Sequence, residues 1–114
     1  MSDECLFCKI ANGEVSAQLL VDDDDLVAFN DISPQAPVHL LIIPKKHIAT
    51  VNDLTDADAD IISKLTMCAK TLAREQGISE SGYRLLLNCN AQGGQTVYHL
   101  HLHLLGGRQL GALG

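Results

Sequence analysis

The segment 98–105, which reads Tyr-His-Leu-His-Leu-His-Leu-Leu, alternates histidine with leucine. Successive side chains of a β-strand point to opposite faces, so this alternation separates the two residue types onto two faces of one strand. A neutral imidazole carries one donor and one acceptor that need partners when buried, and it titrates near neutral pH. We therefore predict a strand whose leucine face packs in the core and whose histidine face contacts a ligand, a metal or water. The histidines are His99, His101 and His103.

Two other interpretations of the histidine face stay open at this point. The strand can be a solvated edge strand that carries its histidines by chance. The three imidazoles can also bind a metal ion directly, because imidazole is a common metal ligand. A metal centre of that kind would make turnover depend on the metal.

The composition limits the class of protein. A chain of 114 residues has the size of one ordinary domain, which we assign to residues 1–114. No apolar run is long enough to span a bilayer, and residues 1–4 lack the basic and apolar regions of a signal peptide. We expect a cytoplasmic protein that has no membrane partner.

Acidic residues dominate the charge of the chain. The net charge is -6, and 12 of the 14 Asp and Glu residues lie in the first 60 positions. Nucleic-acid backbones are bound chiefly by clustered Lys and Arg, so this balance argues against a nucleic-acid partner, although it allows a small nucleotide pocket. The run 22–25 lacks the alternating ligand spacing of an EF-hand, and we interpret it as a solvated turn.

The remaining segments predict two helices and several strands. Residues 5–12 predict a short helix ended by Gly13, and Thr55 begins a long helix that ends before Gly77. Strands are expected at 19–21, 26–29, 38–43 and 83–88, in addition to the histidine strand. This order predicts an α+β fold with a mostly antiparallel sheet.

Two features fall close to the histidine strand in this scheme. His39 interrupts the apolar strand 38–43, either as a satisfied core histidine or as a partner of the histidine strand. Gly93 and Gly94 come shortly before the histidine strand, and paired glycines allow backbone N–H groups to meet phosphate oxygens.

Four cysteines in a chain without an expected secretion signal favour thiols or metal ligands over disulfides. Cys5 and Cys8 form a Cys-x-x-Cys pair. Cys68 lies on the apolar stripe of the long helix, where a core position is the simplest explanation.

Four motifs resemble those of the histidine triad (HIT) family: the histidine segment, Asp-Ile-Ser-Pro-Gln-Ala-Pro at 31–37, Ile-Pro-Lys-Lys-His at 43–47 and Gly-Gly-Gln-Thr-Val-Tyr at 93–98. They are most similar to the Hint branch, the purine nucleoside phosphoramidases. His103 stands where the nucleotidyltransferase branch has glutamine, and the Gly-Gly-Arg at 106–108 is lacking in the dinucleoside polyphosphate hydrolases. The resemblance implies a HIT-like fold, in which a five-stranded mostly antiparallel sheet with one long and one short helix joins a second sheet across a homodimer.

The resemblance also implies an activity on a purine nucleotide. Hint proteins cleave the P–N bond of substrates such as adenosine phosphoramidate or lysyl- and aminoacyl-adenylates, releasing AMP and an amine through a nucleotidyl-histidine. By resemblance His101 is the nucleophile, His103 stabilises charge as the amine departs, and His99 and His39 complete the catalytic set. The implied nucleotide contacts are Asp31 with the ribose, Ile32 and Phe7 with the base, and Asn88, Gln95 and Thr96 with the phosphate.

The Cys-x-x-Cys pair is similar to that of bacterial family members with a zinc site. There the ligands would be Cys5, Cys8, His47 and His99, a closed Cys₂His₂ set that is typical of structural zinc and is not required for the chemical step. Two thiols in the core are the alternative. Two alternative functions also stay open: a dinucleoside polyphosphate hydrolase, and a nucleotide-binding regulatory module without turnover.

Overall fold

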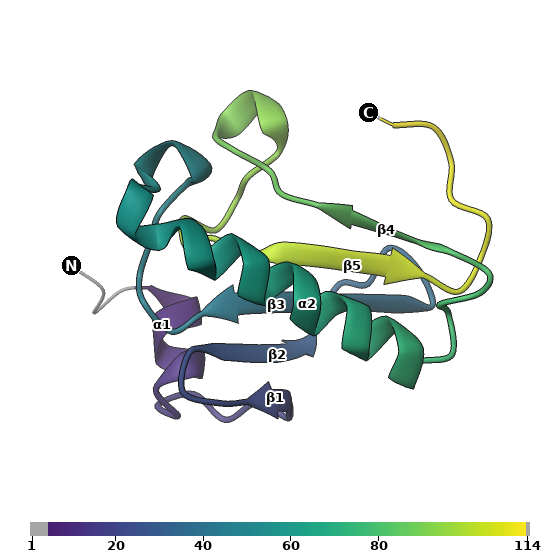
Figure 1. Ribbon diagram of the computed structural model, residues 1–114, viewed down its shortest axis with the longest axis horizontal. Coiled ribbons are helices and arrows are strands. Elements are labelled where there is room, and N and C mark those ends of the chain that lie inside the picture. The colour runs from purple at the N-terminus through teal and green to yellow at the C-terminus, as the bar shows by residue number, and fades with distance from the viewer. Residues whose placement is uncertain (1–4, 114) are drawn as a thin grey trace.

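The computed structural model describes residues 5–113, and its strands form a five-stranded antiparallel sheet in the order β1-β2-β3-β5-β4 (Figure 1). The predicted α+β fold is confirmed, with one main helix and a short one. The strands are β1 (Leu19–Asp22), β2 (Leu26–Asn30), β3 (Val38–Pro44), β4 (Tyr83–Leu86) and β5 (Leu102–Gly106). The helices are α1 (Leu6–Ala11) and α2 (Ala59–Glu75), with 3-10 turns η2 (Val51–Asp53), η3 (Asp56–Asp58) and η4 (Ala91–Gly93). Residues 1–4, on which the prediction about a signal peptide depends, lie outside the described residues.

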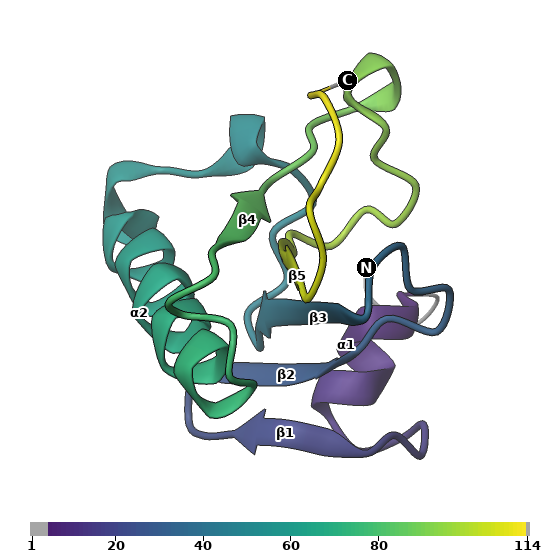
Figure 2. The same ribbon diagram turned by 90° about the vertical axis from the view of Figure 1, so that its right-hand side faces the viewer.

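The two helices cover opposite faces of the sheet (Figure 2). On one face α2 packs against β3 and β5, and its buried Leu65 and Leu72 share a core with the leucines of the histidine segment. On the other face α1 packs against β3, where Phe7 joins a second core. The predicted leucine face is confirmed, because Leu100, Leu102 and Leu104 are all buried in the first core. The histidines therefore lie on the α1 side of the sheet.

β3 is the strand on which both cores depend. It lies between β2 and β5, and its side chains alternate between the two cores. Leu40 and Ile42 pack under α2, whereas Leu41 and Ile43 pack under α1. A strand buried on both faces reads as a nearly continuous apolar run, which is the pattern that predicted it.

The histidine segment is less regular than predicted. β5 begins at Leu102 rather than at Tyr98, so the first two histidines precede the strand. The backbone N–H of Leu100 donates to the carbonyl of Ile48 over 2.6 Å, and the ring of His99 bonds to the carbonyl of Pro44 over 2.8 Å. These residues depart from the strand because their polar groups bond to the last carbonyl of β3 and to a carbonyl in the segment that follows it, outside the regular strand pairing.

Two other predicted boundaries differ from the structure. β4 ends at Leu86, two residues before the predicted end at Asn88. Thr55 caps the 3-10 turn η3 rather than α2 itself, since its backbone N–H and hydroxyl both donate to the Asp58 carboxylate.

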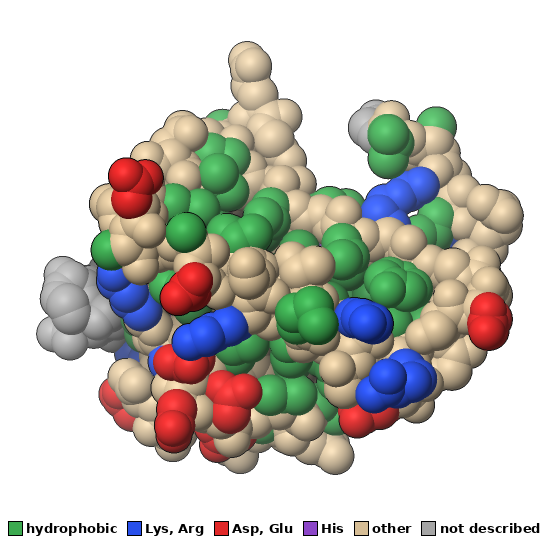
Figure 3. Space-filling view, in the orientation of Figure 1, with side chains coloured by type: hydrophobic (Ala, Val, Ile, Leu, Met, Phe, Trp, Pro, Cys, Tyr) green, Lys and Arg blue, Asp and Glu red, His purple; other side chains and the backbone are tan. Residues whose placement is uncertain are grey.

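The acidic run between β1 and β2 forms a turn, as predicted. Oδ1 of Asp23 accepts the backbone N–H groups of Asp25 and Leu26, and these bonds lower the pKa of the Asp23 carboxyl. On the face drawn in Figure 3 several basic side chains lie beside acidic ones. Within residues 5–113 no helix is both long and apolar enough to cross a bilayer.

Candidate active site and metal centre

A pocket of about 890 Å³ lies on the α1 side of the sheet, between α1, the segment after β2 and the histidine segment. Apolar side chains form much of its wall, including Phe7, Ile10, Phe29 and Leu41. The polar side chains that line it include Asp31, His39, Thr96, His101 and His103. An apolar pocket with a few converging polar groups is the usual form of a small-molecule site.

A backbone carbonyl fixes the tautomer of His101. Its Nδ1 lies 2.7 Å from the carbonyl oxygen of His99, and since a carbonyl can only accept, Nδ1 of His101 must carry the proton. Nε2 of the neutral ring therefore keeps its lone pair. The ring of Phe7 meets the His101 ring edge-on, with 5.1 Å between the centroids. In the neutral form of His101 this bond leaves Nε2 as the unprotonated ring nitrogen.

A chain of hydrogen bonds fixes the tautomer of His103. The backbone N–H of Gln35 donates to Nδ1 of His39 over 3.0 Å, so the proton of a neutral His39 lies on Nε2. That Nε2–H donates to Nδ1 of His103 over 2.9 Å, which places the proton of His103 on its Nε2. Nε2 of His103 is buried and has no hydrogen-bond partner within residues 5–113. A buried donor without a partner is rare in folded proteins, and here it is available to a bound ligand.

Burial keeps these two rings neutral. Desolvation, assisted by the neighbouring histidines, lowers the pKa of His103 to about 4. Desolvation also lowers the pKa of His39, against the opposing effect of the Asp31 carboxylate. A second proton on Nδ1 of His103 would in addition face the Nε2–H of His39. Hydrogen bonding and desolvation therefore both favour a neutral His103 that donates through Nε2.

Asp31, His39 and His103 offer three ligand atoms within 4.8 Å of one another, so they are close enough to hold a metal ion. To bind a cation through Nε2, His39 would have to carry its proton on Nδ1, which already accepts the N–H of Gln35. The hydrogen bonds thus favour a hydrogen-bond relay, which runs from the N–H of Gln35 through His39 to His103, over a metal site. Asp31 lies beside this relay: its Oδ2 is 3.4 Å from Nε2 of His39, while its Oδ1 accepts the backbone N–H of Ser33 over 2.8 Å.

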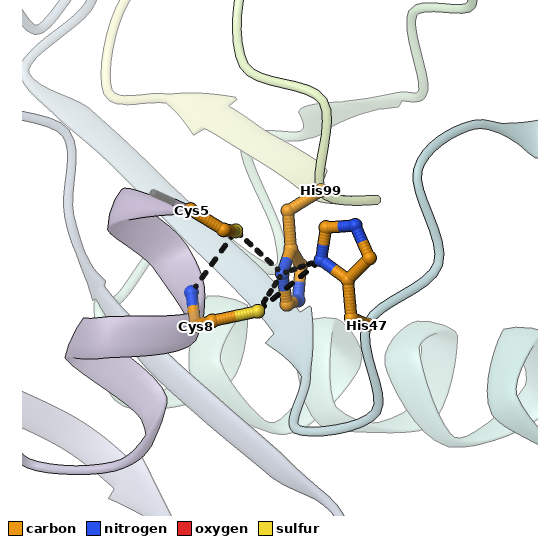
Figure 4. Close-up of side chains that lie close together, drawn as sticks. All are labelled: Cys5, Cys8, His47 and His99. Carbon is orange, nitrogen blue, oxygen red and sulfur yellow. Dashed lines mark hydrogen bonds between the residues drawn. The ribbon is translucent and has the colours of Figure 1, made fainter. Parts of the chain in front are cut away.

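A second cluster lies beside the pocket and combines two thiols with two imidazoles (Figure 4). Cys5 and Cys8 come from the start of α1, His47 follows β3, and His99 precedes β5. Nδ1 of His99 lies 3.3 Å from each sulfur and 3.2 Å from Nδ1 of His47. Sγ of Cys8 lies 3.2 Å from Nδ1 of His47. The predicted ligand set is therefore brought together by three separate segments of the chain.

The chemistry of the four groups fits a metal ion. The ring of His99 donates its Nε2–H to the carbonyl of Pro44, so its Nδ1 lone pair is directed at the cluster. Burial lowers the pKa of His99 to about 4 and keeps that lone pair unprotonated. In a tetrahedral zinc site, Zn–S bonds of about 2.3 Å and Zn–N bonds of about 2.0 to 2.1 Å separate sulfur from nitrogen by about 3.5 Å. The separations found here are close to that value, and the donor set is compatible with zinc.

The structure places some predicted nucleotide-binding residues in the pocket and others outside it. Phe7, Asp31, Ile32 and Thr96 line the pocket together with the histidines. The side chain of Ile32 is 92% exposed, so it is not a core residue. Asn88 is not among the lining residues, and its predicted phosphate contact stays a prediction.

Gln95 also lies outside the pocket lining, and its predicted phosphate contact stays a prediction. Its Oε1 accepts the backbone N–H of Asn90 over 2.9 Å, and its Nε2 donates to the carbonyls of Ala49 and Val97 over 2.8 and 3.1 Å. Both amide hydrogens are used, and the side chain is buried. Gln95 thus holds the loop that carries Thr96.

Sequence reasoning missed two parts of the site. The segment 15–18 before β1 lines the pocket, but nothing in its composition distinguishes it from other loops. Gln35 acts through its backbone N–H, a group that every residue except proline carries, so no side-chain pattern could have identified it.

Comparison with known proteins gives consistent matches over nearly the whole chain. The HIT domain family model matches residues 12–110. The chain is 47% identical over 113 residues to the purine nucleoside phosphoramidase of Escherichia coli strain K12, covering 99% of this chain and 95% of that protein. A solved HIT family hydrolase from Legionella pneumophila Philadelphia 1 superimposes with a TM-score of 0.90 at 60% identity, covering 92% of this chain and 94% of the other. A histidine triad protein from Clostridium difficile superimposes with a TM-score of 0.94 at 42% identity, covering 98% and 97%.

Proposed function

This chain belongs to the HIT domain family, and we propose that it is a hydrolase that cleaves the P–N bond of purine nucleoside 5′-phosphoramidates. One observation carries the proposal: the bond from Nδ1–H of His101 to the carbonyl of His99 leaves Nε2 of a neutral His101 for nucleophilic attack, and the neighbouring His103 has an Nε2–H without a partner within residues 5–113. A nucleophile beside a neutral hydrogen-bond donor suits two-step transfer of a nucleotidyl group. The name of the E. coli relative supports the phosphoramidate as substrate. The span of the family match supports the predicted single HIT domain over residues 1–114.

In the first step Nε2 of His101 attacks the α-phosphorus. A P–N bond to the imidazole forms, the P–N bond to the amine breaks, and the departing nitrogen takes up a proton from water. The Nδ1–H of His101 keeps its bond to the carbonyl of His99, which stabilises the positive charge that develops on the ring. Two-step covalent catalysis of this kind replaces one difficult displacement by two easier ones.

In the second step water attacks the nucleotidyl-histidine. The bond between phosphorus and Nε2 of His101 breaks, the lone pair returns to the ring, and the proton that water loses balances the one taken up by the amine. The products are the nucleoside monophosphate and the amine.

His103 acts in both steps as a neutral donor. The rings of His101 and His103 lie 4.9 Å apart between centroids, so an Nε2–H on His103 can reach groups on the phosphorus that His101 attacks. We assign it the stabilisation of negative charge on the phosphoryl oxygens and on the leaving group. A preorganised donor in a buried site stabilises developing charge without reorganising during the reaction.

The nucleoside part of the substrate would occupy the apolar end of the pocket. We propose that Asp31 accepts hydrogen bonds from the ribose hydroxyls through its Oδ2, which is not used by Ser33. Phe7 and Ile32 line the pocket where they can contact the base, and Thr96 can contact the phosphate.

We propose a structural role for zinc at the cysteine-histidine cluster. The four residues would close its coordination sphere, so the ion would join α1 to the segment that follows β3 and to the segment that precedes β5, without binding substrate. In this arrangement the carbonyl oxygen of His99 holds His101 for catalysis. The ring of His99 would bind the structural metal.

We also propose that two copies form a homodimer. β4 is an edge of the sheet in the described chain, and an edge strand can pair with a second copy. Hydrophobic side chains are exposed over α2 and on the surface toward β4 (Figure 3), and Met67 of α2 is 59% exposed. Light scattering should give about twice the chain mass of 12.3 kDa, whereas the mass of one chain would contradict the dimer.

Hydrolysis of adenosine 5′-phosphoramidate, followed as AMP release, tests the proposed reaction. Diadenosine polyphosphates are the second substrate class to test. Faster cleavage of those compounds would instead identify a dinucleoside polyphosphate hydrolase. Nucleotide binding by the folded protein without turnover of either class would identify a regulatory module.

A further inference from the structure

Arg108 contacts the hydrogen-bond relay of the pocket without lining the pocket itself. It follows β5, and its Nη2 donates to the carbonyl oxygen of Gln35 over 2.8 Å. Its Nη1 donates to the carbonyl of its neighbour Gln109 over 3.0 Å. Gln35 is the residue whose N–H fixes the tautomer of His39. Arg108 therefore binds the carbonyl of Gln35, and the N–H of the same residue begins the relay.

The sequence next to Arg108 permits this contact. Gly107 has a φ of +93°, a left-handed conformation that other residues rarely adopt. A Cβ at Gly107 would lie 2.9 Å from Cβ of Pro37, which is too close for the two segments of the chain to keep their present separation. Glycine thus lets the chain after β5 lie against the loop 31–37 and brings Arg108 to Gln35.

The other bonds of this loop are local. The backbone N–H of Asp31 donates to the carbonyl of His39 over 2.9 Å, where the loop closes on β3. The Gln35 side chain donates to the carbonyl of Ser33 over 2.9 Å. The bond from Arg108 is different, because it ties the middle of the loop to the end of β5, the strand that carries His103.

We propose that Arg108 is a positioning residue: by binding the carbonyl of Gln35 it fixes the backbone of this residue, and so holds the proton of His39 on Nε2 and the proton of His103 on Nε2. When this bond is removed, the Gln35 N–H no longer holds Nδ1 of His39 as an acceptor, and His39 can adopt its other tautomer. Nε2 of His39 then accepts from Nδ1–H of His103, and Nε2 of His103 turns a lone pair toward the substrate. A lone pair repels the phosphoryl oxygens that the N–H would stabilise.

Nitrogen-15 NMR of the histidine side chains tests the tautomer directly in the full-length protein. In the wild type we expect His103 protonated on Nε2, whereas Arg108→Gln should show both tautomers. Arg84→Gln is a matched control, because Nη2 of Arg84 also donates to a backbone carbonyl in an exposed hydrogen bond, to Gly111 over 2.9 Å. Arg108→Lys keeps one charged donor and should retain more of the wild-type tautomer. An unchanged His103 tautomer in Arg108→Gln would overturn the proposal.

The kinetic consequence depends on the proposed phosphoramidase function. Arg108→Gln, which loses one exposed charged hydrogen bond, should lower kcat about three- to tenfold with a smaller change in KM. Arg108→Lys should restore part of the lost kcat. The control Arg84→Gln should stay within about twofold of the wild type, since it removes a bond of the same kind outside the relay.

A double-mutant cycle with His39→Ala separates this relay from general loosening of the loop. If Arg108 acts through His39, then Arg108→Gln should have no further effect on kcat in the His39→Ala background. An equal loss in both backgrounds would contradict the relay. A wild type without phosphoramidase turnover would refute the proposed function instead, and the NMR comparison of Arg108→Gln with the wild type would still decide the role of Arg108.

Discussion

Zinc at the cysteine-histidine cluster should stabilise the protein and leave the chemical step unaffected. The perturbation is removal of the metal by a chelator, or Cys8→Ser, which replaces a sulfur 3.2 Å from Nδ1 of His47 and 3.3 Å from Nδ1 of His99. Cys89→Ser is the control, because Cys89 is a half-buried cysteine that lies outside the cluster. We expect one zinc per chain in the wild type and in Cys89→Ser, and a loss of zinc in Cys8→Ser.

The size of the effect follows from linkage. A ligand present at a hundred times its Kd stabilises the folded state by about 2.7 kcal/mol. An unfolding entropy of about 2.1 cal/mol/K per residue gives about 0.24 kcal/mol/K for 114 residues. Saturation to this degree should therefore raise Tm by about 11 °C in a thermal scan with a defined concentration of unbound zinc.

Two results would refute the reasoning on zinc. A wild type that binds no zinc after reconstitution, or whose Tm does not change with zinc, would show that the cluster is only a group of core thiols and histidines. Phosphoramidase activity that disappears with the metal, while circular dichroism shows the protein still folded, would place the metal in the chemical step.

Two further predictions concern the pocket. Asp31→Asn keeps an Oδ1 acceptor for the Ser33 N–H but removes the negative charge. We expect kcat/KM for a ribonucleoside phosphoramidate to fall about tenfold, with a smaller fall for its 2′-deoxy analogue. Equal falls for the two substrates would exclude contact between Asp31 and the ribose. Because the pKa of His103 is about 4 in the folded state against an ordinary value of 6.5, the unfolded state binds more protons between these values, and stability falls as the pH drops through that range. Between pH 7.5 and 4.5, urea unfolding of metal-free His103→Asn should show about 2 kcal/mol less loss of stability than the metal-free wild type, and equal losses would argue against a neutral buried His103.

The strands, and the faces that they bury, could be predicted because their signals are local. The alternation of leucine and histidine fixed which face of the segment enters the core, and Leu100, Leu102 and Leu104 are buried as expected. The continuous apolar run that forms β3 indicated a strand covered on both faces. The ligand set Cys5, Cys8, His47 and His99 came from family resemblance, and the structure brings the four residues together.

The parts that could not be predicted depend on backbone groups. The histidine segment reaches strand geometry only at Leu102, because His99 and Leu100 bond to carbonyls that follow or end β3. Gln95 was assigned to phosphate by resemblance, and the bonds of its amide to the loop around it were not predicted. The tautomers of His101 and His103 depend on the carbonyl of His99 and the N–H of Gln35, groups that carry no residue signature.

Nucleophilic attack by His101 is the central claim of this account. The most direct measurement is steady-state AMP release from adenosine 5′-phosphoramidate by the wild type and by His101→Ala, with folding and zinc content checked in both proteins. We predict a fall in kcat of at least about a thousandfold in His101→Ala, because the variant has no nitrogen that can form the covalent intermediate. A folded His101→Ala protein that keeps more than about a tenth of the wild-type rate would contradict a covalent mechanism at His101.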